Sequence, residues 1–70
     1  MGLLLFKQKG SFVLSQETLE GFDEIGRFAN IEELKNHLNN TGQRITWFGE
    51  SLSDIEVLLH LRKYEKRIAY

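Results

Sequence analysis

The fold is decided by one stretch, which reads Gly49-Glu50-Ser51-Leu52-Ser53-Asp54-Ile55-Glu56-Val57-Leu58-Leu59. A strand is expected to end at its glycine, and the longest amphipathic element of the chain begins inside it. Ser53 and Glu56 have the spacing of a capping box, in which a hydroxyl and a carboxylate satisfy amides at the start of a helix. We therefore expect a helix that begins at Leu52 or Asp54 and runs to about Ile68.

The residues before this stretch predict a strand and an earlier helix. Residues 44–48 are mostly β-branched and aromatic, which is typical of a strand. Residues 30–40 predict a helix in which Asn30 is the cap and Glu33 completes a capping box. Gly42 can adopt the left-handed backbone conformation that commonly ends such a helix. The apolar stripe of this helix consists of Ile31, Leu34 and Leu38.

The N-terminal part predicts a β-hairpin followed by an ambiguous segment. Residues 3–6 and 12–14 are apolar runs separated by a turn glycine. Such continuous runs indicate strands that are covered on both faces, or an edge that pairs with another chain. Beyond the hairpin, an apolar residue recurs at every third position, which fits neither a strand nor a helix. We expect a loop through Gly21 and then a strand over residues 24–29, with a short helix over residues 18–23 as the alternative.

Length and composition limit the class of protein. The predicted elements make one α+β domain over residues 1–70, with a small antiparallel sheet of three to four strands and two helices in the order β-β-(β)-α-β-α. The chain has no cysteine, so disulfides and thiolate metal sites are excluded. A small core without such links often gains stability from self-association, and we expect a homodimer. No apolar run is long enough for a signal peptide or a membrane span, so we expect a cytoplasmic protein without a membrane partner.

The expected C-terminal helix has apolar side chains on two sides. At about 100° per residue, one broad stripe should pack on the sheet, and it contains Val57, Leu58, Leu61, Tyr64 and Ile68. Leu52, Ile55 and Leu59 fall on a different arc. Since one helix on one sheet buries a single stripe, the second arc needs another cover. That cover is the first helix or the loop before it, a dimer partner, or a different protein.

Catalysis and metal binding are not expected. Each histidine follows a glutamate by four residues, which places Glu33 beside His37 and Glu56 beside His60 on a helix. Such pairs are usually solvated surface neighbours, and the carboxylate-rich metal sites of helix bundles use a spacing of three. The glycines form no phosphate-binding fingerprint. We expect no enzyme activity, no cofactor and no metal.

The motif Gly49-x-Ser51-Leu52-Ser53-Asp54-x-Glu56-Val57-Leu58 resembles a segment of the small uracil-DNA glycosylase inhibitors of φ29-like phages. The resemblance covers about ten of the seventy residues. It implies a dimeric phage protein that inhibits a host DNA-repair enzyme by occupying its DNA-binding surface. It also implies that Ile55 and Glu56 lie where an apolar finger of the glycosylase is received. That family has an aromatic residue at the position of Ile55 and returns to a strand soon after the motif.

Together these features predict a non-enzymatic protein-interaction module, in its sharpest form a phage-type inhibitor of a host DNA-processing enzyme such as uracil-DNA glycosylase. An apolar patch beside carboxylates suits the basic cleft of such an enzyme. The candidate partner-binding residues are Glu50, Leu52, Asp54, Ile55, Glu56 and Leu59. The alternative is a small dimeric nucleic-acid-binding regulator that uses Arg62, Lys63, Lys66 and Arg67. A third possibility is a structural subunit whose second apolar arc only makes the dimer.

Overall fold

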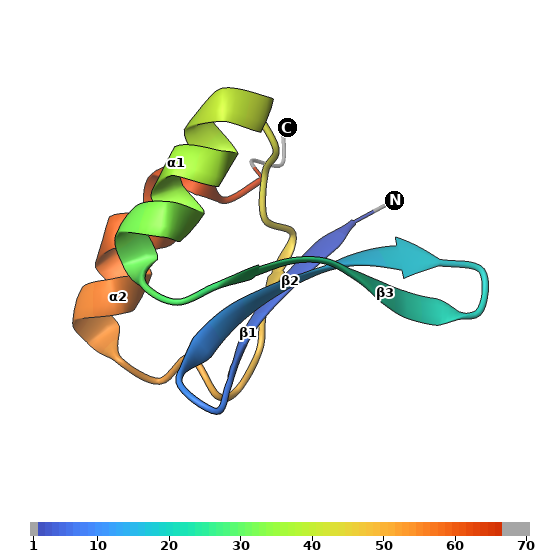
Figure 1. Ribbon diagram of the computed structural model, residues 1–70, viewed down its shortest axis with the longest axis horizontal. Helices are drawn as coiled ribbons and strands as arrows, with labels where there is room; N and C mark the ends of the chain where they lie inside the picture. Colours follow the sequence, from blue (N-terminus) through green and yellow to red (C-terminus); the bar gives the residue numbers. More distant parts are fainter. Residues whose placement is uncertain (1, 67–70) are drawn as a thin grey trace.

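The computed structural model describes residues 2–66. In it, two α-helices pack on one face of a four-stranded sheet (Figure 1). The strand order across the sheet is β3-β2-β1-β4. Along the chain the elements are β1 (Leu3–Gln8), β2 (Ser11–Thr18), β3 (Gly21–Phe28), α1 (Ile31–Thr41), β4 (Trp47–Phe48), α2 (Ile55–Leu61) and a short 3-10 helix, η1 (Arg62–Tyr64). The α+β class and the order of strands and helices are as predicted.

The predicted N-terminal hairpin is confirmed, with longer strands than the apolar runs alone indicated. Lys9 and Gly10 form its two-residue turn with φ angles of 51° and 80°. Two positive φ angles match the twist of the flanking strands, which explains why glycine occurs here. Leu5 pairs with Leu14 across the two antiparallel strands. Both of these leucines are fully buried and belong to the main core.

The ambiguous segment is a second hairpin. β2 continues to Thr18 and β3 begins at Gly21, so the predicted loop is shorter than expected and the alternative short helix is wrong. A β-bulge explains the misleading period of three. Leu14 pairs with Gly26 while the next residue, Ser15, pairs with Glu24, which leaves Ile25 as the additional residue. Apolar side chains before and after a bulge point to opposite faces although their spacing is even.

The first helix is confirmed in its caps and buried face, and it ends one residue later than predicted, at Thr41. The amide of Glu33 donates to the side-chain oxygen of Asn30 at 3.0 Å, and the Glu33 carboxylate accepts from the amide of Ala29 at 2.9 Å. Gly42 follows the last turn with a φ of 71°, and its amide donates to the Leu38 carbonyl at 2.9 Å. The local signals of a helix therefore determined its position, and Leu34 and Leu38 are fully buried beneath it.

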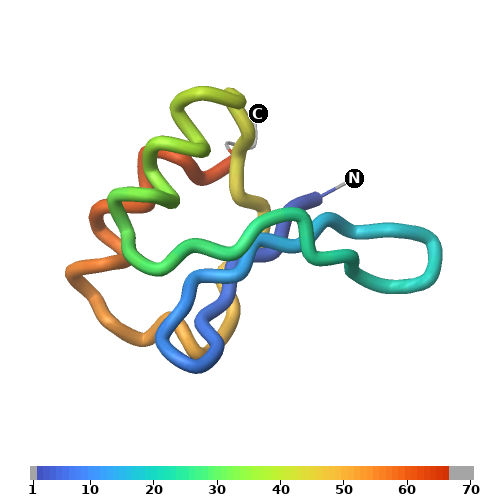
Figure 2. The backbone as a smooth tube through the Cα atoms, viewed as in Figure 1, coloured from blue at the N-terminus to red at the C-terminus, as the bar shows by residue number. Residues whose placement is uncertain are grey.

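β4 corrects the expectation of a wholly antiparallel sheet. It pairs parallel to β1, with Leu4 opposite Trp47 and Leu5 opposite Phe48. β3 forms one edge of the sheet, and α1 carries the chain back to the other edge, so the returning strand runs in the same direction as β1 (Figure 2). β4 is also shorter than the predicted strand over residues 44–48. Ile45 lies outside it and forms only an isolated bridge with Glu65.

The C-terminal helix is shorter than predicted at both ends. Its cap is Asp54, whose carboxylate accepts from the amide of Glu56 at 2.9 Å, and not Ser53. It ends at Leu61, after which η1 turns the chain back toward Ile45. The amide of Ile45 donates to the carbonyl of Tyr64, and the amide of Lys66 donates to the carbonyl of Ile45, each at 2.7 Å. The expected end near Ile68 lies outside the described residues.

Neither α1 nor α2, the two α-helices of residues 2–66, has the length and apolarity needed to cross a bilayer. The two helices instead cover the same side of the sheet. Their buried side chains meet those of the strands in one cluster, which consists of Leu3, Leu5, Phe12, Leu14, Leu34, Leu38, Ile45, Leu52, Leu61 and Tyr64.

A close approach of β1 and β4 requires Gly49. Its amide donates to the Leu5 carbonyl at 2.7 Å, and a Cβ built on it would lie 2.8 Å from the Cβ of Phe6. We expect Gly49→Ala to lower the free energy of unfolding by about 1–3 kcal/mol, measured by urea denaturation, because the two strands must shift apart. The neighbouring exposed change Glu50→Ala is the control and should cost less than about 0.5 kcal/mol. Equal stability of the two variants would contradict this account of the approach.

Candidate partner-binding site

The structure divides the predicted apolar arc. Leu52 is only 6% exposed and belongs to the core, so its assignment to a partner-binding surface is wrong. The reason is that Leu52 precedes the helix. Its amide donates to the Gly49 carbonyl at 3.0 Å in a turn, and the helical period that linked it to Ile55 does not apply there. The fold of this chain therefore supplies the cover for Leu52.

The remaining two residues of the arc are open to solvent. Ile55 is 72% exposed and Leu59 is 59% exposed, and they lie one turn apart on the outer side of α2. With their neighbours they line an open hollow of about 400 Å³, which we call the α2 hollow. Its lining residues are Phe48, Ile55, Leu58, Leu59, Arg62 and Glu65.

Sequence reasoning missed two apolar members of the α2 hollow. Leu58 was placed on the stripe that packs against the sheet, and in the structure it is half-buried, contacting the core while lining the hollow. Phe48 pairs with Leu5 at the end of β4, on the helix-covered side of the sheet. Its position was detectable only from the alternation of the strand, because the neighbouring Trp47 points to the other side. The hollow thus combines residues from β4, α2 and η1.

The predicted acidic residues surround the start of α2 but do not line the hollow. Glu50, Asp54 and Glu56 are all exposed. The carboxylate of Asp54 is engaged in capping the helix, whereas among residues 2–66 the side chains of Glu50 and Glu56 make no capping contact with α2. At the rim itself the charged groups are one guanidinium, Arg62, and one carboxylate, Glu65. Four apolar side chains with a mixed rim are suited to bury an apolar side chain of a partner.

The predicted basic cluster is divided between two surfaces. Arg62 borders the α2 hollow, whereas Lys66 lines a separate hollow of about 340 Å³ together with Arg44. The Arg44 guanidinium also donates to the main-chain carbonyl of Lys63, so Arg44 is a basic residue near this cluster that sequence reasoning left out. Lys63, Lys66 and Arg62 are exposed. Arg67 lies outside the described residues.

The pair of Glu33 and His37 is held differently from what its spacing suggested. The Glu33 carboxylate turns to the start of α1, where it accepts from Ala29. His37 instead makes a 2.9 Å hydrogen bond through Nε2 to the side-chain oxygen of Gln43, and its ring packs on Phe28 at 5.0 Å between centroids. Within residues 2–66, no three metal-ligating side chains lie together.

Comparisons with known proteins identify no relative from which a function could be inferred, so the inference of function rests on the geometry of the site. No protein-family model matches the chain, and no curated protein or solved structure shows significant similarity to it. The resemblance of residues 49–58 to the phage glycosylase inhibitors therefore stays a prediction. No family is assigned to this chain on these comparisons.

Proposed function

We propose that the chain is a non-enzymatic protein that binds another protein through the α2 hollow. The observation that carries the proposal is the exposure of Ile55 and Leu59 beside the half-buried Phe48 and Leu58. Fully burying one aliphatic side chain of this size contributes about 1.5–3 kcal/mol. Apolar side chains grouped around a concavity with a polar rim are a common form of binding site.

The charges near the α2 hollow favour a partner with a basic surface. Glu50 and Glu56 are exposed on either side of the helix start, and Asp54 adds a third carboxylate between them. A partner that inserts an apolar side chain and places basic groups around it would meet both features. The DNA-binding clefts of enzymes are lined with basic groups of this kind. The sharpest form of the proposal is therefore a phage-type inhibitor of a host DNA-processing enzyme, with uracil-DNA glycosylase as the target that the resemblance names.

A uracil-excision assay tests the sharpest form directly. Purified chain, titrated into a bacterial uracil-DNA glycosylase acting on a uracil-containing duplex, is expected to abolish excision at a stoichiometric ratio. The control is a chain carrying Ile55→Asp, which leaves the core untouched and should leave excision undiminished. Full excision at every concentration of the unchanged chain rejects the glycosylase as target. Capture of a different DNA-processing enzyme by the unchanged chain, but not by Ile55→Asp, would keep the broader proposal.

A nucleic-acid-binding regulator is the second candidate, because the fold places Arg44 beside Lys63 and in one hollow with Lys66. Phosphate contacts of this kind make affinity fall steeply as the salt concentration rises. If this candidate is correct, a labelled oligonucleotide binds at low salt, and changing Arg44 and Lys66 to glutamine removes the binding. An oligonucleotide that stays free at low salt rejects it.

A further inference from the structure

The face of the sheet opposite the two helices carries both apolar and charged side chains. Strand alternation and pairing place these side chains on it: Leu4, Phe6, Val13, Ser15, Phe22, Glu24, Arg27 and Trp47. Within residues 2–66, no helix or strand covers this outer face, since α1 and α2 both pack on the side that carries Leu5 and Leu14 (Figure 1). The outer face is distinct from the α2 hollow.

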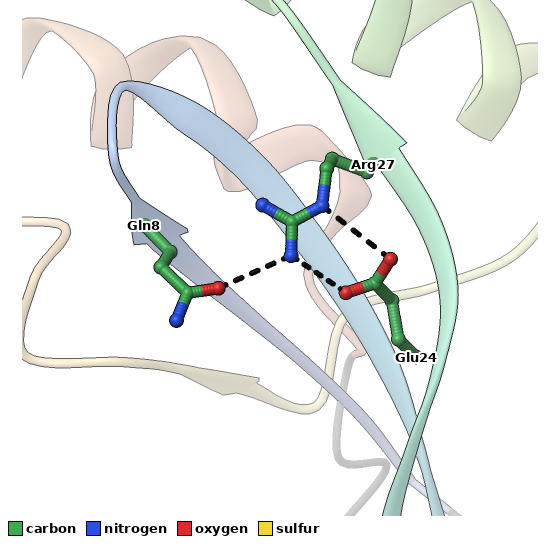
Figure 3. Close-up of polar contacts among 3 residues, drawn as sticks. All are labelled: Gln8, Glu24 and Arg27. Atoms are coloured by element: carbon green, nitrogen blue, oxygen red, sulfur yellow. Dashed lines mark hydrogen bonds and ion pairs between the residues drawn. The ribbon is translucent and has the colours of Figure 1, made fainter.

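One end of the outer face is covered by side chains of the strands themselves and not by a helix. The Arg27 guanidinium donates to the carboxylate of Glu24 at 2.8 Å and to the side-chain oxygen of Gln8 at 3.1 Å (Figure 3). Because Gln8 belongs to β1 and Arg27 to β3, this contact crosses the intervening strand β2. Val13, which pairs with Arg27, is 1% exposed although it lies outside the main core cluster.

Two aromatic rings lie at the other end of the outer face and remain open to solvent. Phe22 and Trp47 meet edge to face with 5.9 Å between ring centroids, although they come from the two opposite edges of the sheet. Trp47 lies against Gly2, where an added Cβ would be 2.5 Å from the indole ring. Phe22 is 49% exposed and Trp47 is 41% exposed. Aromatic side chains are enriched in the cores of protein interfaces.

We propose that the outer face binds the same face of a second copy of this chain, as a two-fold symmetric dimer. A two-fold contact places a surface against itself, so the surface must be self-complementary in charge. The outer face meets this condition, because Glu24 and Arg27 lie three residues apart and are already paired. In the dimer each can also face the opposite charge of the other copy. Glu17, a further carboxylate at the end of this face, is 3.4 Å from the amide of Gly2.

The size of the outer face agrees with a reversible dimer. Three adjacent strands of six to eight residues span roughly 15 Å by 25 Å, which with side-chain relief is about 500–600 Å² of accessible surface per copy. Two copies would bury roughly 1,000–1,200 Å², at the lower end for specific interfaces. A chain of this length, with helices on a single face, gains from covering the other. We therefore expect dissociation on dilution, with a Kd on the order of micromolar.

Sedimentation equilibrium and the fluorescence of Trp47 together test the dimer. Trp47 is the only tryptophan of the chain, so its emission reports burial of the outer face directly. Raising the concentration is expected to double the mass and shift the emission to shorter wavelength in parallel. Phe22→Asp should raise the dissociation constant at least about 100-fold. The matched control is Leu19→Asp in the turn between β2 and β3, where Leu19 is 96% exposed, and it should behave as the unchanged chain.

Charge exchange supplies a second variant that keeps the apolar residues intact. Arg27→Glu places two carboxylates on each copy and should weaken the dimer, while Arg27→Glu combined with Glu24→Arg should restore it. Thermal melts of the monomeric variants confirm that each one is folded.

Three outcomes would overturn the proposal. The first is a monomer at every concentration up to about 1 mM. The second is a dimer that survives Phe22→Asp but is lost in Leu59→Asp, which would place the contact at the α2 hollow. The third is an emission shift that occurs only when a different protein is added. None of these outcomes depends on the uracil-excision assay, so the two proposals fail separately.

Discussion

Truncation of Leu61 to alanine is expected to lower the free energy of unfolding by about 2–5 kcal/mol. Leu61 has no exposed surface and joins α2 to the core cluster, so its removal leaves a cavity that the neighbouring side chains cannot fill. Small domains are stabilised by only about 5–15 kcal/mol in total. The loss should therefore be visible as a large fall in the urea concentration at half-unfolding.

The matched control is the same truncation two residues earlier. Leu59→Ala removes the same atoms from the same helix, but this side chain is 59% exposed. Its cost is expected to be less than about 1 kcal/mol, since exposed substitutions usually have small effects. A similar cost for both variants would contradict the assignment of the buried and exposed sides of α2.

Replacement of Leu59 by aspartate is expected to weaken binding to the partner at least 100-fold, which corresponds to about 2.7 kcal/mol. The change places a carboxylate at the α2 hollow, where an apolar side chain of the partner is expected to be buried without a countercharge. The measurement is the affinity of the variant for purified uracil-DNA glycosylase, or for the enzyme captured in its place, by titration calorimetry. The fold should persist, since Leu59 contributes little to the core.

Leu19→Asp is the control for this experiment as well. It also converts an exposed leucine to aspartate, but it lies in the turn after β2 and away from α2. Its affinity for the partner should equal that of the unchanged chain. Unaltered affinity of Leu59→Asp would show that the partner binds elsewhere, and an equal loss in both variants would indicate a general effect of added negative charge.

The elements that depend on local chemistry could be predicted from the sequence. Asn30, Glu33 and Gly42 act within one turn of the ends of α1, so their types alone locate the helix. The same holds for the turn at Lys9 and Gly10. The continuous apolar run of β1 indicated a strand covered on both faces or an edge strand paired with another chain. In the structure β1 lies between β2 and β4, and the helices cover only the face that carries Leu3 and Leu5.

The parts that depend on distant contacts could not be predicted. α2 ends at Leu61 because the chain after it pairs with Ile45 and because the Tyr64 hydroxyl donates to the side chain of Asn39 at 2.9 Å. The periodicity of apolar residues within the helix contains no information about either of these distant partners. The parallel direction of β4 likewise follows from the path of α1 across the sheet.

The candidate site shows the same division between local and distant causes. Helical period identified Ile55 and Leu59 correctly as an unpaired arc. It included Leu52 wrongly, because the helix starts later than the capping pattern indicated. Phe48 comes from a strand, and a helical projection cannot place it beside α2. Only the folded chain therefore shows the hollow as one surface.

The position of β1 between β2 and β4 has a consequence for the order of folding. β1 and β2 are joined by a two-residue turn, whereas the contact of Leu3 with Thr46 spans 43 positions. Closing the longer loop costs more entropy, so the first three strands should assemble before residues 45–64 dock. Amide hydrogens of β1 and β2 should then exchange most slowly with solvent. Transient release of residues 45–64 would remove the recognition surface on α2 and also withdraw Trp47 from the self-association surface, so only the part of that surface on β1, β2 and β3 would stay in place.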